Sequence, residues 1–230
     1  MASRPAFLVC DADATFQLLL TRQSSLLGVL LHDYGVKPII VPEVEIELRS
    51  HRRLTPLILP ALTKALRNGL LSLMDVGMLE SHFGGGSNGS LAASAAKTNI
   101  NMRGATYGLR VDRGEAYSHA TAVELSVPVL SHDRAALDAL TNAGLAVPRT
   151  VLRFYDLLVF GFQIQRLTAS EIDNVRSSLI AQHEFVPAAF KACSFNDGLH
   201  NFDARLLDGT KSAVGSGRRP SVPFSSPILL

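Results

Sequence analysis

The chain has 230 residues, of which 47% are hydrophobic and 18% are charged, so it can bury a globular core and still leave residues for an elaboration. Its formal net charge of +2 allows a nucleic-acid partner without requiring one, because such binding depends on a local basic patch. With only two cysteines, Cys10 and Cys193, a disulfide framework and a cysteine-based zinc site are excluded. The apolar stretch 6–10 ends too early for a signal peptide, and no apolar run approaches the roughly 18 residues of a membrane span. We therefore expect a cytoplasmic protein.

The first part of the chain alternates between short apolar runs and segments with helical spacing of apolar residues. Buried strands are predicted over residues 6–10, 37–41 and 70–76. Helices are predicted over residues 11–34, with a break near Ser24, over 42–53 and over 55–68. Pro42 suits a first helical position, and Gly35 and Gly69 suit helix ends.

Residues 83–110 interrupt this alternation. FGGGSNGS predicts a flexible loop, and we expect an insertion here that forms a mobile flap beside a site. Regular structure then resumes. Helices are predicted over residues 113–125, 134–143, 151–163 and 168–182, with a strand over 127–131 and a short edge strand over 145–148.

This alternation predicts an α/β protein, a three-layer α/β/α sandwich with a central, mostly parallel sheet. We expect the main domain to span residues 1–160, including the Gly-rich insertion near 83–110. A helical extension should follow over 161–207. The Gly-, Ser- and Pro-rich residues 208–230 are typical of a disordered tail.

Four acidic residues stand where a strand ends or a helix begins: Asp11, Glu47, Glu115 and Asp133. The carboxyl ends of parallel strands lie along one edge of a sheet, so these side chains can converge although they are far apart in sequence. Gathered carboxylates repel each other, and a bound divalent cation is the simplest way to keep them ionised together. The pattern therefore predicts a metal-dependent hydrolase.

The segment DADAT leaves two roles open for Asp11. It can be a metal ligand, or it can be a covalent nucleophile toward phosphate with Asp13 as its general acid/base. Otherwise we expect Asp13 to cap the following helix. In PEVEIEL, the helix dipole favours an acid at Glu43, in the first turn, and Glu45 is expected to face solvent. Glu47 lies too far along the helix for the dipole to account for it, so Glu47 is the candidate ligand.

Other residues near these acids have two interpretations each. His119 lies one helical turn after Glu115 and can serve as a ligand or phosphate contact, but we expect a surface histidine. Asp112 can cap the helix that contains Glu115, and Asp133 can be ligand, cap or both. The candidate phosphate contacts around the acids are His132, Arg103, Arg110, Arg113 and Arg134, of which Arg113 and Arg134 are our main choices.

Together, the strand ending at Asp11, PEVEIEL, DRGEAYSHATA and VLSHD resemble the motifs of PIN-domain nucleases. The resemblance covers about residues 6–160, and the region to about 207 resembles the C-terminal helices of longer members. It implies that Asp11, Glu47, Glu115 and Asp133 take the acidic positions of the family, hold Mg²⁺ or Mn²⁺ and support endonucleolytic cleavage of RNA. It further implies a possible toxin role with a protein antitoxin, and a possible homodimer.

Two alternatives remain open from the sequence. DADAT also resembles the haloacid-dehalogenase-like phosphatases, in which Asp11 would be the nucleophile, although no lysine stands where that family needs one. The other alternative is a catalytically inactive PIN fold that binds protein or RNA.

Overall fold

The computed structural model describes residues 6–50 and 55–204. The chain divides into two compact units, Met1–Val151 and Leu152–Leu230. The division that we expected near residue 160 falls inside a helix, Phe154–Gln163. The tail expected over 208–230 lies outside the described residues. No helix in the described ranges is long and apolar enough to cross a membrane.

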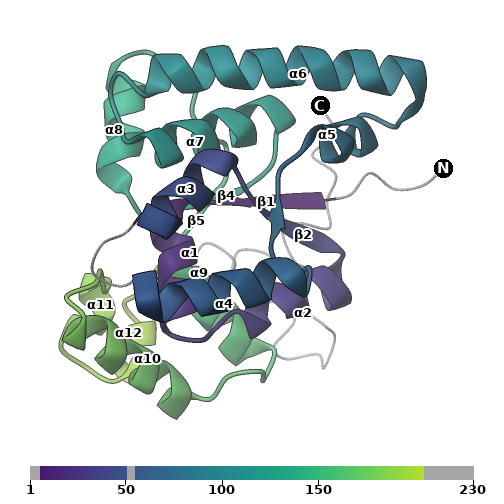
Figure 1. Ribbon diagram of the computed structural model, residues 1–230. Coiled ribbons are helices and arrows are strands. Elements are labelled where there is room, and N and C mark those ends of the chain that lie inside the picture. Colours follow the sequence, from purple (N-terminus) through teal and green to yellow (C-terminus); the bar gives the residue numbers. More distant parts are fainter. Residues whose placement is uncertain (1–5, 51–54, 205–230) are drawn as a thin grey trace. The chain divides into compact units, whose positions relative to one another are not determined.

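A five-stranded parallel sheet forms the centre of the first unit and confirms the predicted α/β class (Figure 1). The strands are β1 (Ala6–Cys10), β2 (Val36–Ile40), β3 (Ser72–Leu73), β4 (Val129–Leu130) and β5 (Val151–Leu152). Their order is β3-β2-β1-β4-β5. β1 and β2 are nearly continuous apolar runs, as expected for parallel strands that are covered on both faces.

The strand order reverses direction at β1. From β1 the chain builds outward through β2 to β3, and it later returns to place β4 on the other side of β1. The register pairs Val9 with Val129 and Cys10 with Leu130, so β1 and β4 end at the same level. In open parallel sheets, ligands bind in the crevice outside the carboxyl ends of the strands at such a reversal. The topology therefore directs attention to the residues that follow β1 and β4.

Eight helices of the first unit surround the sheet within the described residues. They are α1 (Ala12–Leu20), α2 (Ser25–Tyr34), α3 (Pro42–Ser50), α4 (Thr55–Arg67), α5 (Val76–His82), α6 (Gly86–Tyr107), α7 (Arg113–Leu125) and α8 (Arg134–Asn142). Pro42 takes the first position of α3, as predicted. Gly35 ends α2 with a left-handed φ of 67°, which glycine adopts without strain.

One face of the sheet is covered by α5, α6 and α7, which lie together in Figure 1. Phe7 and Val9 of β1 point into this layer, where Ile100 of α6 and Leu125 of α7 pack against them. This core fixes α7 against β1 and β4. The position of α7 matters because Glu115 lies in its first turn.

The expectation of a flexible flap over residues 83–110 is wrong. Within this segment, positive φ values occur at Gly84, Gly85 and Gly86, and the 22-residue helix α6 begins at Gly86. The alanine-rich sequence after the glycines has high helix propensity, and α6 buries a row of small residues against α5 and α7. Tertiary packing thus makes this segment part of a layer of the fold.

The end of the first unit also differs from expectation. The predicted edge strand over 145–148 does not form, and β5 lies instead at Val151–Leu152, where a helix was predicted to begin. Val129 donates its N–H to the carbonyl of Thr150 at 3.0 Å, so this later segment supplies the pairing partner of β4. Helix α9 (Phe154–Gln163) follows directly.

The second unit contains α9 and three further helices around an aromatic core. These helices are α10 (Ala169–Ala181), α11 (Ala188–Lys191) and α12 (Phe195–Leu199). The ring of Phe190 stacks on that of Tyr155 at 5.0 Å and on that of Phe195 at 5.5 Å. Aromatic rings at such separations add to the stability that their burial provides.

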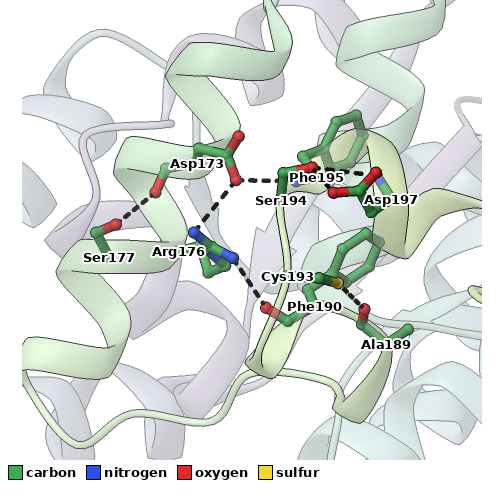
Figure 2. A network of polar contacts seen from close by, with 9 residues as sticks. All are labelled: Asp173, Arg176, Ser177, Ala189, Phe190, Cys193, Ser194, Phe195 and Asp197. Carbon is green, nitrogen blue, oxygen red and sulfur yellow. Dashed lines mark hydrogen bonds and ion pairs between the residues drawn. The ribbon is translucent and has the colours of Figure 1, made fainter.

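A polar network ties α10 to the segment that carries α11 and α12 (Figure 2). Asp173 accepts a hydrogen bond from the N–H of Phe195 at 2.9 Å and pairs with Arg176 at 3.5 Å. Arg176 in turn donates to the carbonyl of Phe190 at 3.4 Å. The carboxylate of Asp173 therefore satisfies the first turn of a short helix that has little stability of its own.

Candidate acidic site at the carboxyl ends of the strands

Asp11 stands at the junction of β1 and α1. Its N–H donates to the carbonyl of Leu130 at 3.0 Å, which extends the pairing of β1 with β4 to this residue. Its Oδ1 accepts the N–H of Ala14 at 2.9 Å and so caps α1. The sequence placed this cap at Asp13, which is wrong: Asp13 lies in the first turn and its side chain is largely exposed. Asp11 itself is only 2% exposed.

Asp133 occupies the equivalent junction after β4. Its Oδ1 accepts the N–H of Ala136 at 3.1 Å and caps α8, as predicted. Between the two aspartates lies Ser131, which is fully buried. The Oγ of Ser131 accepts the N–H of Asp133 at 3.3 Å, and its hydroxyl is hydrogen-bonded to the Asp11 carboxylate. Ser131 therefore links the ends of β1 and β4.

Glu47 reaches the site from α3 and touches the start of α7. Val44 and Leu48 bury one side of α3, which leaves Glu47 half-buried toward α7. A Cβ built on Gly114 would stand 2.2 Å from Oε2 of Glu47, a distance that atoms cannot adopt. Only glycine at position 114 allows this approach. The carboxylate of Glu47 therefore lies against the first turn of α7, the turn that also contains Glu115.

The carboxyl group of Glu115, in the first turn of α7, has a strongly raised pKa. Burial raises the pKa of Glu115 to about 9, and the carboxylates of Asp11, Asp133, Asp13 and Asp112 add to this effect. A carboxyl group with such a pKa holds its proton at neutral pH. Glu115 therefore lies within electrostatic reach of Asp11 and Asp133, from a different helix.

Burial is also the main cause of the raised pKa values of Asp11 and Glu47. Burial raises the pKa of Asp11 to about 7. The hydroxyl of Ser131 and the N–H of Ala14 oppose this effect, whereas Asp13 and Glu47 add to it. The pKa of Glu47 is also raised, first by burial and then by Asp13 and Asp112. Asp11 is thus within electrostatic reach of both Glu47 and Glu115, and Glu115 is within reach of Asp133; we call these four residues the acidic group.

Two acids that the sequence treated as caps also act on this group. Asp13 raises the pKa of Asp11, Glu47 and Glu115, and Asp112 raises the pKa of Glu47 and Glu115. Asp112 stands at the N-cap position of α7, but its side chain makes no cap hydrogen bond. Because Asp13 and Asp112 lie two and three residues from Asp11 and Glu115 in the sequence, the sequence could have indicated that they act on the same group.

Two histidines border the acids. Nε2 of His132 lies 3.8 Å from Oδ2 of Asp13. Burial lowers the pKa of His132, and Asp13 and Asp133 oppose this effect. His119, expected at the surface, is instead 0% exposed. Burial lowers its pKa to about 4, against the effect of nearby Asp133. The prediction of a surface histidine was wrong because the small residues around His119 let this face of α7 pack closely against neighbouring elements, which buries the imidazole.

The predicted phosphate contacts lie at the starts of α7 and α8. Arg113 is 75% exposed and stands 3.7 Å from Glu43, and Arg134 is 89% exposed and stands 3.6 Å from Asp138. Ion pairs at such exposure are weak, so both guanidinium groups can turn to another anion. Arg103, by contrast, stands 3.8 Å from Glu124 in the α6–α7 layer.

The donor set at these strand ends suits a hard divalent cation. It consists of carboxylate oxygens, which Mg²⁺ and Mn²⁺ prefer. Burial raises the pKa values of Asp11 and Glu115, and neighbouring carboxylates add to this effect. As the side chains stand, no three His, Cys, Asp or Glu residues of the described ranges form a metal-binding group. The metal-ligand role of Asp11, Glu47, Glu115 and Asp133 therefore stays a prediction from the sequence.

Comparisons with protein-family models, curated proteins and solved structures gave no match to this chain. The function of the acidic group has to be argued from its own geometry.

Proposed function

We propose that the protein is a metal-dependent endoribonuclease that hydrolyses RNA phosphodiester bonds at the acidic group. One observation carries the proposal. Asp11, Glu47, Glu115 and Asp133 come from four separate segments; burial raises the pKa values of Asp11, Glu47 and Glu115, and Glu47 adds to the effect at Asp11 while Asp11 and Asp133 add to it at Glu115. Such convergence is costly to a fold without a ligand, and a divalent cation offsets it. Mg²⁺ or Mn²⁺ is the proposed cofactor.

When bound, the cation would supply a water activated for attack on phosphorus and would stabilise the leaving oxygen. The residues of the chain prepare the site for it. Ser131 holds Asp11 and the backbone of Asp133 in a fixed relation across two strands. Gly114, which has no side chain, leaves room for the carboxylate of Glu47 beside α7, and Glu115 must release its proton to become a ligand.

RNA is the proposed substrate because the sequence motifs resemble those of PIN-domain nucleases and exposed arginines flank the acids. Arg113 is the first residue of α7, the helix that contains Glu115. Arg134 is the first residue of α8, directly after Asp133. In this proposal their guanidinium groups contact the phosphates on either side of the scissile bond. A cytoplasmic toxin role with a protein antitoxin, and a homodimer, extend the proposal on the resemblance alone.

The test is cleavage of a mixed single-stranded RNA pool with Mn²⁺, Mg²⁺ or chelator, with a generic phosphomonoester assayed in parallel. Wild type is compared with Asp11→Asn and Asp13→Asn. We expect metal-dependent RNA cleavage that Asp11→Asn abolishes and Asp13→Asn only reduces, with no release of phosphate from the monoester.

Other outcomes reject the proposal in distinguishable ways. Phosphate release without RNA cleavage, lost in both variants, would identify a phosphatase in which Asp11 is the nucleophile and Asp13 the acid/base. RNA binding without cleavage in any metal would identify an inactive binding module.

A further inference from the structure

Helix α6 runs along the outside of the layer that it forms with α5 and α7, and it is apolar on two opposite sides (Figure 1). Its inner side buries mostly small and apolar residues, which are Gly89, Ala93, Ala96, Ile100, Gly104 and Tyr107. Its outer side has a second stripe at helical spacing, all of it exposed, which consists of Leu91, Ala95, Thr98, Met102, Ala105 and Leu109. A surface helix usually has one apolar side and one polar side, and a helix that is apolar all round is buried. The outer stripe of α6 is therefore expected to have a partner.

The large side chains of the outer stripe are more exposed than a stable surface favours. Leu91 is 72% exposed, Met102 is 66% exposed and Leu109 is 81% exposed. Leu109 stands in the turn after α6, where its N–H donates to the carbonyl of Thr106 at 3.4 Å. Between these residues the stripe has only small side chains and no charge. Single exposed leucines need no explanation, whereas a continuous apolar strip marks an interaction surface.

The outer stripe is symmetric about its centre. Its members are separated by four, three, four, three and four residues, which is the spacing that pairs two helices along an apolar seam. From either end the order begins with leucine and alanine, and Thr98 and Met102 occupy the centre. When a second copy is laid antiparallel on the first, Leu91 of one copy meets Leu109 of the other. The alanines then meet each other and allow the helix axes to approach to about 8–10 Å.

We propose that the outer stripe of α6 is the interface of a homodimer, in which two copies of α6 pack antiparallel about a two-fold axis. A two-fold interface uses the same surface of both subunits, so that surface must be complementary to itself. The symmetric order of the outer stripe meets this requirement, which an unrelated partner would not impose. The inference does not rest on the proposed nuclease function, because no residue of the outer stripe belongs to the acidic group.

The length of the outer stripe sets the strength of the dimer. Leu91 and Leu109 are 18 positions apart. At a helical rise of about 1.5 Å per residue, the contact is about 27 Å long. One helix from each copy gives a contact at or below the low end of specific interfaces, which bury about 1,200–2,000 Å² in total. We therefore expect a reversible dimer with a dissociation constant on the order of 10 μM.

The first experiment is sedimentation velocity of the full-length protein over concentrations on both sides of this dissociation constant. Wild type is compared with Met102→Glu, which brings two like charges together near the two-fold axis, and with Leu57→Glu as a matched control. Leu57 is 61% exposed in α4, so the control makes a similar change outside the outer stripe. Circular dichroism verifies that each variant is folded.

We expect wild type and Leu57→Glu to dimerise equally and Met102→Glu to dimerise at least about tenfold more weakly, because like charges in contact oppose association. A wild type that stays monomeric at the highest concentration would overturn the inference and leave the outer stripe to another partner. Dimerisation of Met102→Glu at the wild-type strength, or equal weakening in both variants, would also overturn it.

The second experiment tests the antiparallel arrangement by disulfide cross-linking. The partly exposed thiol of Cys193 is first removed by Cys193→Ser, whereas Cys10 is buried and can stay. In this background Leu91→Cys and Leu109→Cys proteins of different mass are mixed under mild oxidation. We expect a disulfide between the two variants and none within either one. Cross-linking of Leu91→Cys to itself would indicate parallel helices, and a dimer without any cross-link would use another face; both results contradict the proposed interface.

The dimer and the nuclease fail separately. A monomeric protein that cleaves RNA would reject the dimer and leave the nuclease standing. A protein that dimerises through the outer stripe and cleaves no RNA would keep the interface and reject the nuclease.

Discussion

Replacing Asp11 by asparagine should stabilise the metal-free protein, although Asp11 lies at the centre of the proposed site. Asn is nearly isosteric and equally good at a helix N-cap, so the hydrogen bond from Ala14 is kept. The substitution removes the charge and exchanges one carboxylate oxygen for an amide NH2, to which the Ser131 hydroxyl can turn as an acceptor. Because the carboxylate is buried among other acids, its loss should favour the folded state at any pH at which Asp11 is ionised.

The size and the sign of the effect follow from the pKa of Asp11. Burial raises this pKa from the usual 3.8 to about 7, so the folded protein binds the proton more tightly than the unfolded chain. The free energy of unfolding therefore falls as the pH rises through this interval and stays low above it. At about 1.36 kcal/mol for each pKa unit, ionised Asp11 costs on the order of 4 kcal/mol above pH 7.

The assay is urea denaturation followed by far-ultraviolet circular dichroism, in chelator, across this pH range. Asp11→Asn should exceed wild type by up to about 4 kcal/mol at pH 8 and should match it near pH 4. The matched control is Asp75→Asn, because Asp75 caps α5 through the N–H of Met78 at 2.8 Å but is exposed and outside the acidic group. A variant less stable than wild type at pH 8, or a difference that does not depend on pH, would refute the reasoning.

Three further predictions follow from named contacts. Gly114→Ala should disrupt the site, because the new Cβ would meet Oε2 of Glu47 at 2.2 Å, and a displacement of this kind can lower activity by about 100-fold. In the control Gly77→Ala the nearest atom, Oδ1 of Asp75, is at 3.4 Å, so activity should persist, and equal losses in both variants would reject the close approach. Binding of Mn²⁺ at pH 7.5 should release a proton from Glu115, whose pKa is about 9, so the affinity for Mn²⁺ should rise with pH. Calorimetry in buffers of different ionisation enthalpy measures this proton. Binding of Mn²⁺ without proton release would exclude Glu115 as a ligand. Asp173→Ala should lower the free energy of unfolding of the second unit by about 1–3 kcal/mol and speed hydrogen exchange at the Phe195 amide. The control Ser177→Ala, at the edge of the same network, should change little. Unchanged hydrogen exchange in Asp173→Ala would contradict the capping role of Asp173.

The sequence was sufficient to predict the elements that depend on local signals. Apolar runs marked β1 and β2, and Pro42 and Gly35 marked helix boundaries, because hydrophobic periodicity and backbone restriction act within a few residues. The convergence of Asp11 and Asp133 also followed, since parallel strands bring their carboxyl ends together.

What the sequence did not show depended on contacts between distant segments. The Gly-rich start of α6 resembled a loop because the packing of α6 on α5 and α7 is not encoded in its own residues. The burial of His119 depends in the same way on the layer around α7. Ser131 appeared in the sequence only as part of VLSHD, and its link to Asp11 required the register of β1 with β4.

The most direct test of the central claim compares Glu47→Gln with Glu45→Gln in Mn²⁺-dependent cleavage of single-stranded RNA. Both residues lie in α3, but Glu47 borders Gly114 and the acidic group, whereas Glu45 forms an ion pair with Arg49 at 2.7 Å. The account predicts that wild type and Glu45→Gln cleave RNA and that Glu47→Gln does not. Cleavage by Glu47→Gln at the wild-type rate would contradict a catalytic site formed by these carboxylates.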